Sequence, residues 1–147
     1  MNRSPTSATW AEQWFTERFV SAEIRSAGTH AYDGREASAF ATDAMRELGF
    51  DMRSHRTSRL AAEHLAWADH VVVMEPMHRD VALSLDPGAA DKIIPMWDFI
   101  EDGGDEVDDP HGGALDAYRA SAKELGEASK ALVAHILAER RRRRTGG

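Results

Sequence analysis

Apolar residues recur at helical spacing near the start of the chain. The stripe consists of Trp10, Trp14, Phe15 and Phe19. Steps of four, one and four residues place these side chains on one face of a helix that is expected to run to about Val20. Ser4 is the expected N-cap of this helix, and Pro5 suits the first turn because its missing N–H is not needed there.

Two further stripes predict helices in the middle and at the end of the chain. The first consists of Phe40, Ala44, Met45 and Leu48 and predicts a helix over 37–48, which Gly49 ends. The last consists of Leu115, Tyr118, Ala122, Leu125, Leu132 and Ile136. It predicts a helix from 113 to about 140. Residues 140–147 begin with five consecutive arginines and are expected to form a basic, disordered tail.

Short apolar runs between the helices predict strands at 22–25, 70–74 and 92–96, although Pro95 weakens the last one. Ser58 is expected to cap a helix over 59–68, and Pro76 to open one over 76–85. Helices that alternate with buried strands predict a three-layer α/β/α domain with a small parallel sheet over residues 1–139. The chain starts on a helix, whereas in such sheets a strand usually leads into the first helix.

Charge and composition exclude several classes of function. The formal net charge of −7 argues against general nucleic-acid binding. The longest purely apolar run is the four residues from Val71 to Met74, so no membrane span is expected. The first residues carry no apolar leader, and cytoplasm is therefore the expected location.

The 147 residues include no cysteine. This excludes disulfides, thiolate zinc sites, iron–sulfur clusters and any reaction in which this chain supplies a thiolate nucleophile. The seven histidines show no spacing typical of metal ligands, so we expect neither a metal site nor another cofactor.

Two segments carry side chains that suit phosphate chemistry. Arg3 and Ser4 lie where free backbone N–H groups and the helix dipole favour an anion, and a guanidinium can hold two phosphate oxygens. Asp109, in the acidic loop before the last helix, could act as a general acid. From the residues alone, an ordinary N-cap and a solvated acidic loop remain open. For Ser26 and His55 a plain turn and an exposed histidine remain open.

Taken in order, these segments resemble the low-molecular-weight protein tyrosine phosphatase family. The family's phosphate loop reads Cys-x-x-x-x-x-Arg-Ser, commonly followed by Pro, and Arg3-Ser4-Pro5 matches its end. The other matching segments are Arg25-Ser26-Ala27-Gly28-Thr29, the stretch from Ser54-His55 to Leu60, Val71-Val72-Val73-Met74 and Val107-Asp108-Asp109-Pro110. The resemblance extends to about Leu137 and implies the family's fold and hydrolysis of aryl phosphate monoesters such as phosphotyrosine.

The resemblance also implies catalytic roles. Arg3 would bind the phosphoryl oxygens, and Ser4 would donate a hydrogen bond to the catalytic sulfur. Asp109 would protonate the leaving oxygen and then deprotonate the water that hydrolyses the phosphoenzyme.

Four further residues would support the site by the same resemblance. Ser26 and His55 would brace the phosphate loop, and His111 stands where the family often carries an aromatic side chain that flanks the substrate ring. Asn2 occupies the position before the arginine, where many members have a second cysteine. The expected partner is a phosphorylated protein or a small phosphate ester, with no nucleic acid and no membrane.

The nucleophilic cysteine of the family would stand six residues before Arg3, and the family's first central strand would precede it. Two explanations are open: the natural protein begins upstream and this chain is N-terminally truncated, or the chain is a non-catalytic relative that binds phosphate, phosphopeptides or a partner. On either explanation we expect this chain to be inactive, because losing the nucleophile typically costs on the order of 10⁶ in rate.

Two other interpretations compete with the phosphatase. Self-association through the arginine run and the acidic loop over 98–109 is one of them. Thioredoxin-coupled arsenate reductases share the fold by resemblance, but they need further cysteines, which this chain does not have. The pattern does not predict an oligomeric state or a physiological substrate.

Overall fold

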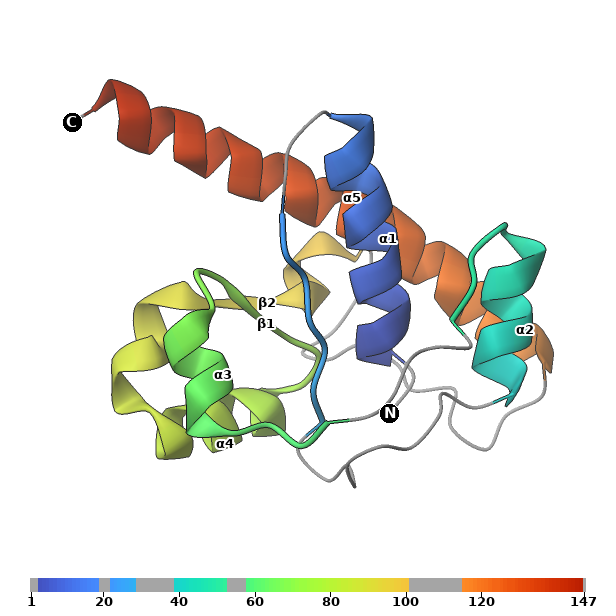
Figure 1. The fold of residues 1–147 in the computed structure, drawn as a ribbon, viewed down its shortest axis with the longest axis horizontal. Coiled ribbons are helices and arrows are strands. Elements are labelled where there is room, and N and C mark those ends of the chain that lie inside the picture. Colours follow the sequence, from blue (N-terminus) through green and yellow to red (C-terminus); the bar gives the residue numbers. More distant parts are fainter. Residues whose placement is uncertain (1–2, 19–21, 29–38, 53–57, 101–114, 147) are drawn as a thin grey trace.

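The computed structural model describes residues 3–18, 22–28, 39–52, 58–100 and 115–146. The helices are α1 (Arg3–Glu17), α2 (Ala39–Glu47), α3 (Ala62–Trp67), α4 (Pro76–Leu85) and α5 (Leu115–Thr145). The strands are β1 (Val71–Val73) and β2 (Ile93–Pro95), and two short 3-10 helices flank β2, η1 (Pro87–Lys92) and η2 (Met96–Phe99). Figure 1 shows α5 crossing the molecule, with α1 against its middle.

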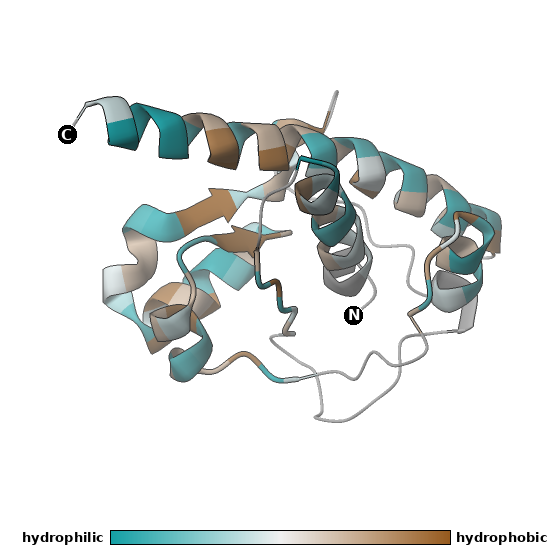
Figure 2. Ribbon diagram, turned by 45° about the horizontal axis from the view of Figure 1, so that its top comes forward, coloured by the Kyte–Doolittle hydropathy of each residue, from teal (hydrophilic) through white to brown (hydrophobic). Residues whose placement is uncertain are grey.

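The two strands form a parallel sheet between two helical layers. Val71 pairs with Ile93 and Val72 with Ile94, and the ladder ends at Pro95, which has no N–H to donate. Since neighbouring side chains of a strand point to opposite faces, Val71 and Ile93 pack against α3, α4 and η1, whereas Val72 and Ile94 pack toward α1 and α5. Figure 2 shows both strands as hydrophobic segments between these layers. The predicted small parallel sheet in an α/β/α arrangement is therefore confirmed.

The strand predicted at 22–25 is wrong, because that stretch makes no ladder among the described residues. Among the described residues, the extended segment 22–28 makes one strand-like pairing, a parallel bridge between Gly28 and Arg59. The N–H of Gly28 donates to Ser58 O at 2.9 Å, and the N–H of Leu60 donates to Gly28 O at 2.9 Å. Ala22, Glu23 and Arg25 are exposed and Ile24 alone of this stretch packs against the core, so a single side chain anchors it.

Two predicted helix starts are also wrong. Helix α1 already includes Ser4, which is therefore not its N-cap. Helix α3 begins at Ala62, because Ser58 belongs to the bridge and its hydroxyl donates to Ser26 O at 3.5 Å. The ring of His64 performs the capping instead, with Nδ1 accepting from the N–H of Ala61 at 2.9 Å.

Helix α5 runs for 31 residues, about 46 Å, and continues through the arginine run. Residues 140–145, expected in a disordered tail, are its last turns. Arginine is a good helix former, and positive side chains suit the negative end of the helix dipole. The N–H of Gly146 closes the helix by donating to Arg142 O at 2.9 Å.

Helix α2 packs on the N-terminal half of α5. Ala44, Met45 and Met52 join Tyr118 and Ala122 in a buried cluster. On the surface, the guanidinium of Arg119 donates to both carboxylate oxygens of Glu47 at 2.8 and 2.7 Å, which lowers the pKa of Glu47. Leu48, expected on the buried stripe, is 38% exposed because α2 ends at Glu47.

Candidate functional site

The start of α1 places Arg3 and Ser4 in the first turn of a 15-residue helix. The first N–H groups of a helix have no partner inside it, and the dipole adds partial positive charge there. The first turn carries no acidic residue that would compete for these donors. The backbone at this point therefore suits an anion.

The position of α1 is fixed by polar contacts to α5 in addition to apolar packing. The hydroxyls of Ser7 and Ser129 lie 2.9 Å apart, and both side chains are buried. The Nε1–H of Trp10 donates to Ala122 O at 3.0 Å, and the Nε1–H of Trp14 donates to Gly126 O at 3.1 Å. The two indoles stack with their ring centroids 5.4 Å apart. Together these contacts attach α1 to the long helix from Ser7 to Trp14, directly after its first turn.

The structure describes only part of the site expected from the resemblance. Ser26 is half-buried on the extended segment, next to the Gly28 bridge. Arg3 and Ser4 stand at the start of α1. The other four expected residues, Asn2, His55, Asp109 and His111, lie outside the described residues. That Arg3 and Asp109 face one cavity stays a prediction.

Sequence reasoning missed an acid–imidazole pair at the carboxyl end of β1, the edge where ligands of such sheets bind. The Nδ1 atom of His78 accepts from the N–H of Met74 at 3.3 Å, and its Nε2 lies 3.4 Å from Oε1 of Glu75. With Nδ1 accepting, the ring proton is held on Nε2, toward the carboxylate. The available signal was the Met-Glu-Pro sequence directly after the valine run.

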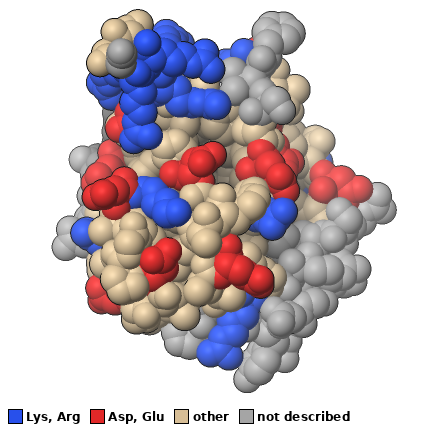
Figure 3. All heavy atoms as spheres, turned by 60° about the vertical axis from the view of Figure 1, so that its left-hand side comes forward, with Lys and Arg blue, Asp and Glu red and all other residues tan. Residues whose placement is uncertain are grey.

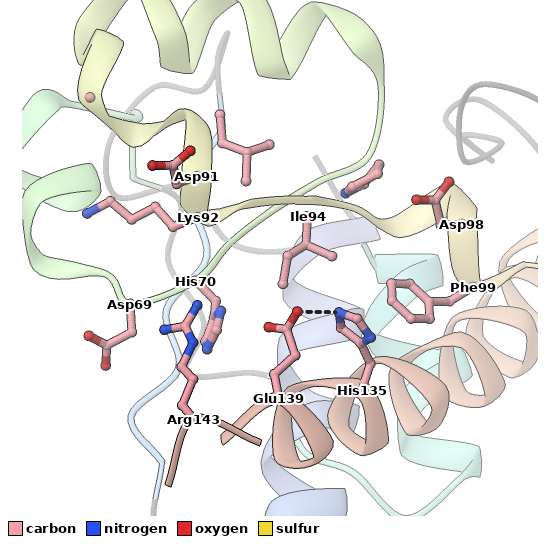
Figure 4. Close-up of a pocket in the computed structure, with 13 residues that line it drawn as sticks. Asp69, His70, Asp91, Lys92, Ile94, Asp98, Phe99, His135, Glu139 and Arg143 are labelled. Carbon is pink, nitrogen blue, oxygen red and sulfur yellow. Dashed lines mark ion pairs between the residues drawn. The ribbon is translucent and has the colours of Figure 1, made fainter. Parts of the chain in front are cut away.

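A groove of about 430 Å³ lies along β2, between the residues that precede the two strands and the C-terminal third of α5. Its walls come from Asp69 and His70 just before β1, from η1, β2 and η2, and from the C-terminal third of α5 (Figure 4). Desolvation lowers the pKa of His70 in this groove. His135 Nε2 lies 3.4 Å from Oε1 of Glu139. Within the described part of the chain, no three His, Asp or Glu residues are grouped to hold a metal ion.

The sequence matches a known family over nearly its whole length. The family described as low molecular weight phosphotyrosine protein phosphatase matches residues 1–142. The chain belongs to this family. Among curated proteins, it is 36% identical over 123 residues to a protein-arginine-phosphatase of Geobacillus stearothermophilus. The aligned residues cover 84% of this chain and 80% of that protein.

Solved structures agree with the assignment. The YwlE arginine phosphatase from Geobacillus stearothermophilus superposes with a TM-score of 0.81 at 34% identity, covering 93% of this chain and 86% of that one. A low molecular weight protein tyrosine phosphatase from T. tengcongensis gives a TM-score of 0.83 at 31% identity, with 90% of each chain covered. The predicted family and fold are thereby confirmed. No helix in the described ranges has the length and apolar character that a bilayer crossing requires.

Proposed function

We propose that this member of the phosphatase family recognises phosphorylated protein side chains, with the phosphoryl group bound at the first turn of α1. The observation that carries the proposal is the placement of Arg3-Ser4, the end of the family's phosphate loop, at the start of a helix fixed on α5. Arg3 would hold two phosphoryl oxygens, and the backbone N–H groups of the first turn would bind the remaining charge.

The relatives named above favour phosphoarginine as the side chain that is recognised. One curated relative and one solved structure with more than 30% identity are named arginine phosphatases. Phosphotyrosine is the second candidate, because the family description and the T. tengcongensis relative name it. In both cases Asp109 would face the atom that leaves phosphorus and supply its proton.

Covalent turnover needs a nucleophile that the 147 residues do not contain, since there is no cysteine among them. The hydroxyl of a serine such as Ser4 is a weak nucleophile unless a neighbouring base activates it. We therefore propose binding without hydrolysis for this chain, with a residual rate on the order of 10⁶ below that of a complete site.

Calorimetry tests the binding step with phosphoarginine, phosphotyrosine and inorganic phosphate as separate probes. Arg3→Ala should weaken binding of each probe at least about tenfold, because a charge-assisted fork is removed. Arg18→Ala is the matched control, since Arg18 is exposed at the other end of α1 and should leave binding unchanged. Equal affinities of the chain and Arg3→Ala would overturn the proposal, and a preference for phosphotyrosine would replace the first candidate by the second.

A turnover assay with para-nitrophenyl phosphate tests the proposed lack of hydrolysis. We expect no release of nitrophenol above the background rate for the chain or for Asp109→Asn. Robust turnover that Asp109→Asn abolishes would show a nucleophile other than cysteine and contradict this part of the account.

A further inference from the structure

The arginine run forms an exposed end of α5. Residues 140–144 are helical and exposed, and none of these five arginines makes an ion pair with another described residue. In Figure 3 they form a dense positive group above the face built from α3, α4 and η1. Because the whole chain carries −7 and these arginines carry +5, all other residues together carry −12. A strongly acidic protein thus presents one concentrated positive end.

The groove below this end has the chemistry that a guanidinium prefers. Four carboxylates line it, those of Asp69, Asp91, Asp98 and Glu139. Three rings, of His70, Phe99 and His135, offer flat faces for stacking. Arginine pairs with carboxylates through a planar fork and stacks on rings, so both features favour it over lysine.

The basic groups of the groove leave room for another cation. Lys92 Nζ donates to Leu65 O at 2.6 Å and to Ala68 O at 3.1 Å, which directs it away from the cavity (Figure 4). Arg143 of the same chain lines one wall, and its neighbours Arg140, Arg141 and Arg142 are exposed. The groove is thus lined by four carboxylates and, besides Lys92, by one further Lys or Arg side chain, that of Arg143.

We propose that two copies of the chain associate by exchange of these surfaces, with the arginine-rich end of α5 of each copy lying against the groove of the other. Both surfaces occur on one side of the same molecule, so a two-fold axis makes the contact twice and leaves no surface open for further addition. Another acidic protein would bind the arginine-rich end only once, whereas a second copy of this chain makes the contact twice. A nucleic acid is repelled by the −12 carried by the rest of the chain.

Sedimentation velocity at about 200 µM protein tests the association. We expect a dimer at about 20 mM NaCl whose dissociation constant rises at least about tenfold at about 300 mM NaCl, because exposed charges are screened. The triple substitution Arg140→Glu, Arg141→Glu, Arg142→Glu and the double substitution Asp69→Lys, Asp91→Lys should each give monomers. An equimolar mixture of the two variants should restore a dimer. In the mixed dimer the glutamate-substituted end of one copy meets the lysine-substituted groove of the other, and the unchanged arginine end meets the unchanged acidic groove.

Two controls separate this contact from general charge effects. Lys123→Glu changes an exposed charge on the first half of α5 and should leave the dimer intact. Arg140→Lys, Arg141→Lys, Arg142→Lys keeps the charge but removes the planar fork, and should weaken the dimer less than the glutamate variant does. A monomer under all conditions, a dimer unaffected by the charge reversals, or a mixture that stays monomeric would each overturn the proposal.

Discussion

Gly126 is the residue on which the contact between α1 and α5 depends most closely. A Cβ atom at this position would lie 2.8 Å from Cε2 of Trp10. The absence of a side chain lets the indoles of Trp10 and Trp14 approach α5 and donate to its carbonyls. A glycine inside a helix costs about 1 kcal/mol relative to alanine, so the close approach must offset that cost.

Gly126→Ala should therefore destabilise the protein despite its better helix propensity. Forcing a methyl group into a packed contact costs about 1–3 kcal/mol, which exceeds the propensity gain of about 1 kcal/mol over most of its range. Urea unfolding measures the difference. In a Trp10→Leu background the same substitution should become neutral or stabilising, and an equal loss in both backgrounds would exclude the steric explanation.

His70 gives the groove a defined pH dependence. Desolvation lowers its pKa from the ordinary value of 6.5, with Arg143 and Arg140 acting in the same direction and Glu139 and Asp69 opposing them. The unfolded chain therefore takes up this proton at a higher pH than the folded chain does. The contribution of neutral His70 to stability is present above pH 6.5 and is lost as the pH falls through the lowered pKa.

His70→Gln should accordingly lose less stability on acidification than the unsubstituted chain. Unfolding by urea at about pH 7.5 and about pH 5.5 provides the comparison, since these values lie on either side of the ordinary pKa of 6.5 at which the unfolded chain takes up the proton. The difference in free energy of unfolding between the two proteins should shift in favour of the variant at the lower pH. A difference that does not change with pH would mean that His70 titrates at the same pH in the folded and unfolded chains.

At the scale of elements, the buried serine pair ties the N-terminal half of α1 to α5. The Ser7 and Ser129 hydroxyls satisfy each other at 2.9 Å, and Ser129 is fully buried. Removal of one partner leaves a buried hydroxyl without that hydrogen bond, whereas removal of both leaves none.

Ser129→Ala should cost about 1–3 kcal/mol of the free energy of unfolding, and the double substitution with Ser7→Ala should cost less than the sum of the two single changes. A double-mutant cycle by chemical denaturation measures this coupling. Strict additivity would show that the hydrogen bond does not fix α1.

The elements also show how far the sequence could predict the fold. Helix α4 has the expected bounds, and the strands β1 and β2 lie within the expected runs, because Pro76 and the β-branched runs are local signals. Whether the stretch 22–25 forms a strand could not be predicted from its own residues, because a strand forms only where another segment pairs with it. The role of Ser58 likewise depends on Ser26, which lies 32 residues away.

At the scale of the whole molecule, the family and the α/β/α arrangement could be predicted because short motifs occur in the right order along the chain. The pairing of Trp10 and Trp14 with Ala122 and Gly126 could not, since it joins positions 112 residues apart. The groove was also missed, because its residues come from separate segments and only the fold brings them together. Its position at the end of the chain predicts a tail for the arginine run, whereas the helix propensity of arginine favours the continuous α5.

The central claim is that a phosphoryl group binds at the first turn of α1. Titration of the ¹⁵N-labelled chain with inorganic phosphate, followed by amide chemical shifts, tests it directly. The account predicts that the largest shifts occur at the amides of Ser4, Thr6 and Ser7, since Pro5 has no N–H, and that Arg3→Ala removes them. Shifts confined to the arginines of α5, or to the groove along β2, would contradict it.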